Sequence, residues 1–304
     1  MLALSICLAL LAALGNAGAS VLQRRAAAEA APASPGARHG SWLAGLLHRR
    51  VWLWGAALLG VAGVLQALAL ATGPLSVVQP VMSTELMFTL VVGGFVFRRR
   101  PDARTRWAFA AMALGLAAFL ALADPTDGRA TVPVAAWLWT ALGAGVFTAV
   151  LGVVSLRLPP SARAAVLGTA TATGFACTAA LLKDALGRLP DGVDAVLTSW
   201  LPYAAVVVGL GSFLLLQITL GAGSLVASQP ALTLGDALLS VVLGVTLFAE
   251  RVHLGWRVVP EVLALALLVA GCARLARSPL VTEDSAQPPG GGDPTAPAPR
   301  GDHW

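Results

Sequence analysis

The sequence predicts an all-α membrane protein with about nine transmembrane helices, and its composition, its apolar segments and its charge placement all indicate this fold class. Of the 304 residues, 57% are hydrophobic and 12% are charged, whereas a soluble domain has about 45–50% apolar and about 25% charged residues. Too few charges remain to cover a soluble surface, so lipid must surround much of the chain. The net charge of +5 does not indicate nucleic-acid binding, because the basic residues stand in short clusters between apolar runs, as membrane topology requires.

Nine segments are apolar over the roughly 20 residues that a helix needs to cross a bilayer. They lack the dyad alternation of a transmembrane barrel. A secretory signal is the alternative for the first segment, but Arg24 and Arg25 follow its apolar run, and a signal carries positive charge before it. We expect helices at about 2–22, 51–71, 74–97, 106–123, 132–155, 163–183, 200–219, 223–248 and 256–276.

The positive-inside rule orients these helices in the inner (plasma) membrane of a bacterial-type cell. With the N-terminus outside and the C-terminus cytoplasmic, 15 of the 20 Lys and Arg residues lie on the cytoplasmic side. Tryptophans near span ends agree with this topology, since indole rings prefer the membrane interface. The five basic residues left outside are Arg129, Lys183, Arg188, Arg251 and Arg257, and the tryptophans are Trp52, Trp54, Trp107, Trp137, Trp139, Trp200 and Trp256.

An internal repeat divides the chain into two similar parts. The stretch QALALATGPLSVVQP at 66–80 aligns with QITLGAGSLVASQP at 217–230, and VVGGFVF at 91–97 aligns with VVLGVTL at 241–247. The Gln and Gln-Pro anchors favour duplication over a chance match between low-complexity apolar segments. The copies are offset by five spans, and an odd offset makes them point in opposite directions, which is typical of secondary transporters.

The repeat predicts a layout of four spans, a connector and four spans. The predicted parts are a first repeat at 1–131 with a flexible loop at 23–50, a connector span at 132–160, a second repeat at 161–277, and a disordered cytoplasmic tail at 278–304. The tail sequence PPGGGDPTAPAP is polar and rich in Pro and Gly.

These motifs resemble the drug/metabolite transporter superfamily, which includes EamA-type permeases and NIPA-type magnesium transporters. The second copy ends in LLSVVLGVTLFAERVHLGW, similar to the end of an EamA-type helix, with Glu250 at its glutamate position. The first copy departs from this pattern, because Arg100 stands where Glu250 stands in the second. The start of the chain, LGNAGASVLQRRAA at 14–27, is similar to the NIPA-type group. The resemblance implies solute transport without ATP hydrolysis and leaves the substrate open.

Two acidic residues lie deep in predicted spans and are our first candidates for substrate or ion binding. Glu85 and Asp236 are 151 positions apart, almost the offset of the repeat. A charge at mid-bilayer costs roughly 2.5–3.5 kcal/mol on insertion scales, and no Lys or Arg lies at equal depth in the sequence. Either these carboxyl groups bind protons or a cation in a central cavity, or each is neutral and hydrogen-bonded to a neighbouring helix.

Glutamines form the second group of candidates, because a side-chain amide in lipid needs hydrogen-bond partners and should face the interior. They could bind a solute or join helices; the four are Gln66, Gln79, Gln217 and Gln229. Pro74, Pro80 and Pro230 are expected to interrupt helices, either as plain kinks or to expose carbonyls to a cavity. For Lys183 and Asp184 a solvated helix end is expected rather than an outer gate.

The predicted function is a secondary transporter that moves a small solute by alternating access, coupled to protons or another cation. A magnesium or other divalent-cation transporter is the alternative substrate class, although the metal ligands are unknown, and a non-transporting membrane scaffold is the alternative of another class. We predict no enzyme, since the motifs HExxH and GxSxG are missing, and no cofactor. The expected partners are the solute and the bilayer; a homodimer stays open.

Overall fold

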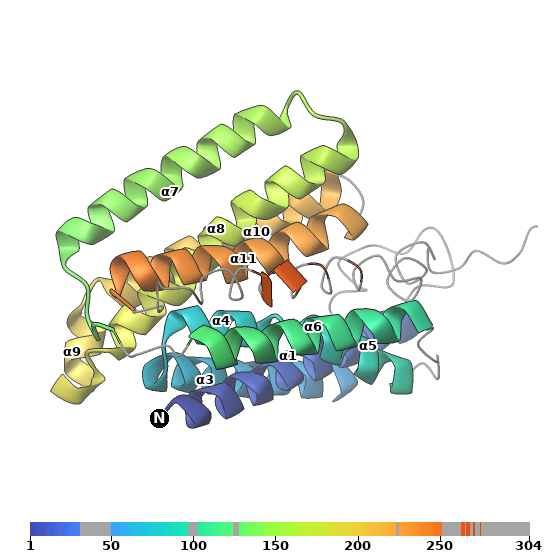
Figure 1. Cartoon of the computed structure of the whole chain (residues 1–304), viewed down its shortest axis with the longest axis horizontal. Coiled ribbons are helices and arrows are strands. Elements are labelled where there is room, and N and C mark those ends of the chain that lie inside the picture. Colours follow the sequence, from blue (N-terminus) through green and yellow to red (C-terminus); the bar gives the residue numbers. More distant parts are fainter. Residues whose placement is uncertain are drawn as a thin grey trace, which may run out of the picture.

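The computed structural model is a bundle of α-helices (Figure 1). It describes residues 1–30, 50–96, 103–123, 128–222, 225–250 and six positions between 263 and 274. All regular elements in these residues are helical, and no strand occurs among them. The α-helices are α1 (Leu2–Ala30), α3 (Arg50–Thr72), α4 (Leu75–Met82), α5 (Glu85–Val96), α6 (Ala103–Ala123), α7 (Val134–Ser155), α8 (Pro160–Leu186), α9 (Val193–Thr198), α10 (Leu201–Ala222) and α11 (Leu225–Leu247), with a short 3-10 helix, η1, at Leu189–Asp191.

Six of the described helical segments are long and apolar enough to cross a membrane, counting α4 and α5 together as one. Two shorter apolar helical stretches, Arg106–Ala121 and Ala231–Leu247, accompany them. The prediction of an all-helical chain with several helices apolar enough to span a membrane is therefore confirmed for the described residues, whereas the count of nine spans and the inverted repeat stay predictions. The predicted ninth span at 256–276 and the tail at 278–304 lie outside the described residues except for isolated positions, and so does most of the loop at 23–50. The start of that loop is corrected, because α1 continues as a helix to Ala30.

The first bundle consists of α1 packed against α3, α4 and α5. Small residues allow the close approach of α1 and α3: a Cβ atom at Gly15 would lie 3.0 Å from the Cβ of Ala62, and one at Gly18 would lie 2.9 Å from Leu58. Glycines at a helix interface allow two helices to approach closely; Gly15 and Gly18 do so here, whereas Gly60 and Gly63 have open space around them.

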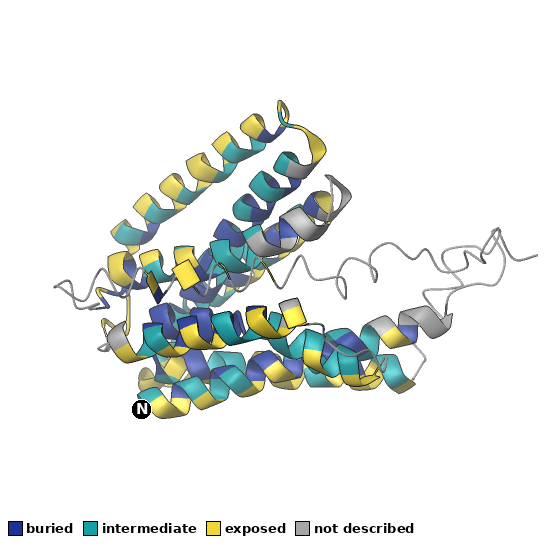
Figure 2. Cartoon of the chain, turned by 45° about the vertical axis from the view of Figure 1, so that its right-hand side comes forward, coloured by how far each residue is buried: buried dark blue, intermediate teal, exposed yellow. Residues whose placement is uncertain are grey.

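The second bundle consists of α8 packed against α10, α11 and α7. The side facing α10 and α11 is again lined by small residues. A Cβ at Gly235 on α11 would lie 2.8 Å from the Cβ of Ala172, and a Cβ at Gly174 would lie 3.0 Å from the Cβ of Ser212 on α10. By contrast, α7 is exposed along most of its length (Figure 2), and only Trp137 and Ser155 are buried in it.

We expect Gly174→Ala to destabilise the second bundle by about 1–3 kcal/mol, the usual cost of overpacking. The added methyl group would collide with Ser212, whose hydroxyl donates to the Val208 carbonyl over 2.7 Å and cannot easily turn away. Thermal unfolding in detergent, followed by tryptophan fluorescence, measures the effect. Gly143→Ala on α7 is the matched control, since nothing lies within 4 Å of its Cβ position; equal midpoints for both variants would contradict the packing role of Gly174.

The two bundles meet through α4 and α11 and through α3 and α8. Several hydrogen bonds between segments far apart in the sequence lie at one end of the molecule. There, Arg129 N–H donates to the Phe248 carbonyl over 2.6 Å, and Lys183 reaches the Gly73 carbonyl. We call this the Glu250 end; it lies on the left in Figure 1, where α1 begins and α8 ends.

Candidate functional site

A break in one span places a carboxyl group in the interior of the molecule. The predicted single helix at 74–97 is two helices, α4 and α5, separated by a turn at Ser83 and Thr84. Pro80 lies inside α4 and cannot donate the backbone hydrogen bond of a helical residue. The Ser83 hydroxyl donates to the Pro80 carbonyl over 2.6 Å, and the Thr84 hydroxyl donates to the Val81 carbonyl over 2.7 Å. These bonds stabilise the turn, and α5 then starts at Glu85.

Glu85 is held by an amide from another helix. The Nδ2 atom of Asn16 on α1 donates to Glu85 Oε2 over 3.1 Å. Asn16 is the sole asparagine of the sequence, and its position in the middle of a predicted span is the signal that could have identified it. In the described residues, Glu85 forms no ion pair with Lys or Arg.

Asp236 lies on α11, close enough to Glu85 and to Cys177 of α8 for electrostatic interaction. Its Oδ1 atom is buried and has no hydrogen-bond partner in the described part of the chain. The structure thus places the two acids that the sequence singled out within range of electrostatic interaction. Both residues are half-buried, Glu85 on α5 beside Asn16 of α1 and Asp236 on α11 near Cys177 of α8.

The four glutamines do not gather at this site. Gln79 is 4% exposed on α4, and Gln66 is half-buried on α3. Gln217 is exposed on α10, so the expectation that it faces the interior is wrong, and the side chain of Gln229 lies outside the described residues. Pro230 also behaves differently from the expectation, because α11 runs through it without interruption.

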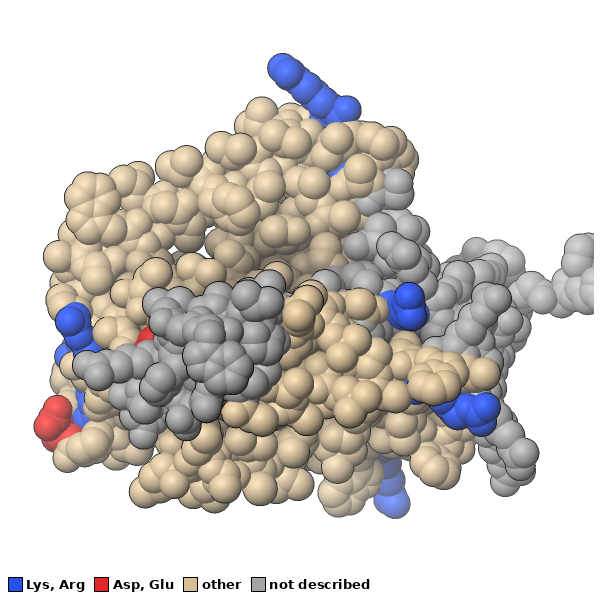
Figure 3. All heavy atoms as spheres, in the orientation of Figure 1, with Lys and Arg blue, Asp and Glu red and all other residues tan. Residues whose placement is uncertain are grey.

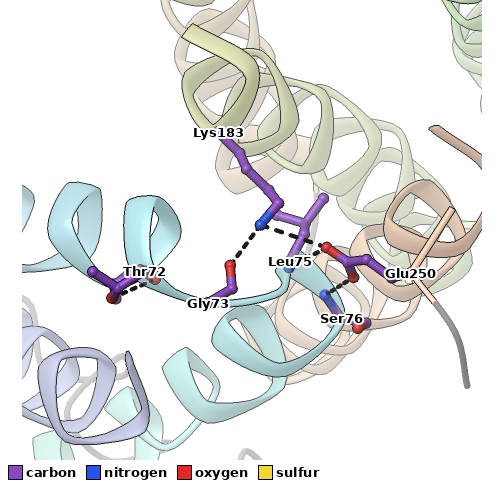
Figure 4. A network of polar contacts seen from close by, with 7 residues as sticks. Thr72, Gly73, Leu75, Ser76, Lys183 and Glu250 are labelled. Atoms are coloured by element: carbon purple, nitrogen blue, oxygen red, sulfur yellow. Dashed lines mark hydrogen bonds and ion pairs between the residues drawn. The ribbon is translucent and has the colours of Figure 1, made fainter. Parts of the chain in front are cut away.

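A second polar site caps α4 at the Glu250 end (Figure 4). The N-cap of α4 is Pro74, which offers no side-chain cap, so the first amide groups of the helix need another acceptor. Glu250 supplies it: the Leu75 amide donates to Oε1 over 2.7 Å and the Ser76 amide donates to Oε2 over 2.9 Å. A carboxylate is favoured at this position by the positive end of the helix dipole.

Lys183 completes this cap. Its Nζ atom donates to the Gly73 carbonyl over 2.5 Å and lies 3.6 Å from Glu250 Oε1. The Glu250 side chain is 0% exposed and that of Lys183 is 13% exposed. The expectation of a solvated helix end at Lys183 is therefore wrong, because this side chain joins α8, α4 and the segment after α11.

Asp184 is also buried and serves the connection before α7. Its Oδ2 atom accepts from Trp137 Nε1 over 2.7 Å, and its Oδ1 atom accepts from the Val132 amide over 3.2 Å. Arg188 lies 3.9 Å from Oδ1. Trp137 packs edge-to-face on Trp200, with ring centroids 6.1 Å apart. The expectation that Asp184 is solvated is therefore wrong. Trp137, which was expected only at the membrane interface, also holds the Asp184 carboxylate through its indole N–H.

Removal of the indole donor should destabilise this connection. We expect Trp137→Phe to lower the free energy of unfolding by about 1.5–3 kcal/mol, as for other hydrogen bonds to charged groups. The measurement is urea or SDS unfolding followed by circular dichroism. Trp139→Phe, on the exposed side of the same helix, should change stability little; a similar loss in both variants would show that the Asp184 bond contributes nothing specific.

Metal ligands are few in this arrangement. Within the residues described, no group of three His, Cys, Asp or Glu side chains could hold a metal ion. A divalent cation between Glu85 and Asp236 would therefore depend on two carboxyl groups, supplemented by amide oxygens such as that of Asn16.

The fold is an α-helical bundle in which six described segments are long and apolar enough to cross a membrane, as in a multi-pass membrane protein, and the site adds polar groups between its helices. The sequence is similar to that of an uncharacterized protein of Corynebacterium glutamicum, with 27% identity over 285 residues, covering 90% of this chain and 95% of the relative. No family model matches the sequence. No solved structure matches it.

Proposed function

We propose that this protein is a secondary transporter of the drug/metabolite transporter type, which moves a small solute across the inner membrane by alternating access. The observation that carries the proposal is the pair of interior carboxyl groups, Glu85 and Asp236, beside a break in a membrane span. Ionisable residues inside membranes commonly mark substrate, ion or proton pathways. Broken helices are frequent at the binding sites of such transporters.

The helix neighbours support an inverted repeat. In the first bundle α1 packs against α3 and against α4 and α5, and in the second α8 packs in the same way against α10 and α11. The halves run in opposite directions, since α1 begins at the Glu250 end and α8 ends there (Figure 1). With α7 as the connector and a ninth span after α11, this layout corresponds to four spans, a connector and four spans.

The surface supports a position within the bilayer. On the face drawn in Figure 3, the charged side chains stand apart at the periphery of the view, and much of the remaining described surface carries no charged side chain. Exposed apolar side chains such as Val150, Phe213 and Leu214 contribute to the sides of the bundle. The N-terminus is then outside and the C-terminus cytoplasmic, by the positive-inside count.

Coupling to protons or another cation fits the same carboxyl pair. In the described residues neither carboxyl group has a Lys or Arg partner, so a bound proton or a cation is the simplest way to neutralise the pair at this depth. Magnesium or another divalent cation is the second candidate, because Glu85, Asp236 and Asn16 offer the oxygen ligands that such ions prefer. A scaffold would not need interior carboxyl groups, and their placement favours transport over it.

Uptake by purified protein in proteoliposomes tests the proposal. A panel of amino acids, organic cations, organic anions and magnesium is assayed with and without an imposed pH gradient. We expect accumulation of at least one class of solute, stimulated by the gradient when coupling is to protons. Liposomes with protein that take up no member of the panel faster than empty liposomes would contradict transport of these classes.

A further inference from the structure

A row of polar atoms without hydrogen-bond partners leads from the interior carboxyl pair toward the Glu250 end. Asp236 Oδ1, Ser240 Oγ and Ser76 Oγ are buried, and none has a partner within the described part of the chain. Ser240 is 0% exposed and Ser76 is 1% exposed. Buried hydroxyl and carboxyl groups are normally satisfied by protein or by ordered water, and these three groups have no such partner among the described residues.

Helix geometry aligns these groups. Asp236, Ser240 and Gly244 follow one another at a spacing of four residues on α11, so they share one face of the helix. The distance along the helix axis from Asp236 to Gly244 is about 12 Å, at about 1.5 Å per residue. At Gly244 the face reaches α4, because a Cβ there would lie 3.1 Å from the Ser76 backbone nitrogen and would overlap the Glu250 carboxylate.

We propose that Asp236, Ser240 and Ser76 form a polar row that holds ordered water and passes protons between Asp236 and the Glu250 end. This proposal rests on the proposed transport function, and it adds the route by which protons reach Asp236. A hydronium ion that arrives at the Asp236 carboxylate protonates it and leaves one water molecule. Each serine hydroxyl on the way accepts one proton and gives up another, so neither serine is changed.

The surroundings favour water over an organic solute in this row. α4 and α11 are in direct contact along it, and the lining groups are two hydroxyls and one carboxyl. Buried water typically makes about three hydrogen bonds to otherwise unsatisfied polar groups. The charged groups at its two ends are Glu85, within electrostatic range of Asp236, and Lys183 beside Glu250, and the Cys177 thiol also lies within electrostatic range of Asp236.

Silver ions test whether water reaches the row, with no need for a known substrate. Ser240→Cys and Ser76→Cys are made in a chain whose three native cysteines are replaced by alanine. Ag⁺ is added to reconstituted protein, and the thiols left free are titrated with a maleimide after denaturation. The control is Ser212→Cys, a position that is 5% exposed and whose hydroxyl is bonded to the Val208 carbonyl. We expect Ag⁺ to protect both row thiols from the maleimide while the control thiol stays free to react. Equal protection of all three thiols, or of none, would contradict the proposal that water reaches this row.

Transport kinetics test the proton role. In Ser240→Ala and Ser76→Ala we expect gradient-driven uptake to fall by roughly tenfold, less than the roughly 100-fold ascribed to a direct general acid. Exchange of solute across the membrane at equal pH should be unchanged, as should both rates in Ser212→Ala. Full gradient-driven uptake in both row variants would overturn proton conduction. If wild-type protein transports no solute, the transport proposal fails by itself, and the silver reaction still decides whether the row holds water.

Discussion

Removal of the Glu250 carboxylate should destabilise the protein more than the substitution of Gly174 or of Trp137. Glu250 accepts the first two amide groups of α4 and faces Lys183, and its side chain is fully buried. Loss of one partner from a buried charge pair typically costs about 3–5 kcal/mol. We therefore expect Glu250→Ala to lower the free energy of unfolding by about this amount. Glu250→Gln should lower it by about 1–3 kcal/mol, because one acceptor oxygen remains.

Thermal unfolding in detergent, followed by tryptophan fluorescence, measures both changes. Asp194→Asn is the matched control, since this acid lies at the same end of the molecule but is exposed on α9. Its effect should stay within about 0.5 kcal/mol, as at most surface sites. A double-mutant cycle with Lys183→Met then isolates the pair: the Lys183 substitution should matter less once Glu250 is neutral. Additive losses of unfolding free energy in the double variant would show that Glu250 and Lys183 do not act as a pair. An unfolding midpoint of Glu250→Ala equal to that of Asp194→Asn would show that the cap does not stabilise the protein.

Neutralisation of the interior acids should have the largest effect on transport. We expect Glu85→Gln and Asp236→Asn each to reduce gradient-driven uptake by about 100-fold or more, the usual contribution of a group that transfers a proton directly. Stability should be unchanged or higher, because an amide at this depth avoids the cost of burying a charge. This combination separates a functional role from a structural one, in which both properties would decline together.

Proteoliposome uptake with and without a pH gradient is the measurement. Thr246→Ala is the control on the same helix as Asp236, because its side chain is exposed and its hydroxyl donates to the Val242 carbonyl of its own helix. Asn16→Leu provides a third variant, which removes the amide that holds Glu85 and should weaken transport less than Glu85→Gln. Wild-type rates and coupling in both acid variants would eliminate the carboxyl pair as the transport site.

The helices themselves were predictable from the sequence, because long apolar runs in a chain with so little charge are typical of membrane-spanning helices. Interruptions were expected at both Pro80 and Pro230, which occupy matching positions in the repeat, but the sequence did not show that only the first copy contains a break. The two prolines differ in the residues that come after them. After Pro80, the hydroxyls of Ser83 and Thr84 bond to nearby carbonyls and stabilise a turn, while Pro230 is followed by Ala231 and Leu232 and the helix continues.

The candidate site was predictable only in part. Glu85 and Asp236 stood out because acids are costly in the middle of an apolar run. The surroundings of Glu250 were not predictable, because its hydrogen-bond partners lie 174 and 175 positions away in the chain. The sequence placed Lys183 at a solvated helix end, whereas the packing of α8 against α4 buries most of this side chain beside Glu250. The prediction for Gln217 was wrong in the opposite direction, because this side chain was expected in the interior and is exposed. Its alignment with Gln66 does not determine which face of α10 it occupies.

The turn at Ser83 and Thr84 separates two parts of one span that have different neighbours. The shorter part, α4, packs on α1 and also on α11 of the second bundle, where Glu250 caps it, while the longer part, α5, packs on α1 of the first bundle. Any tilt of one bundle against the other would therefore pull the two parts of this span in different directions, and the strain would concentrate at the joint. Since Glu85 is the first residue beyond that joint, its carboxyl group lies where such a displacement changes its environment most.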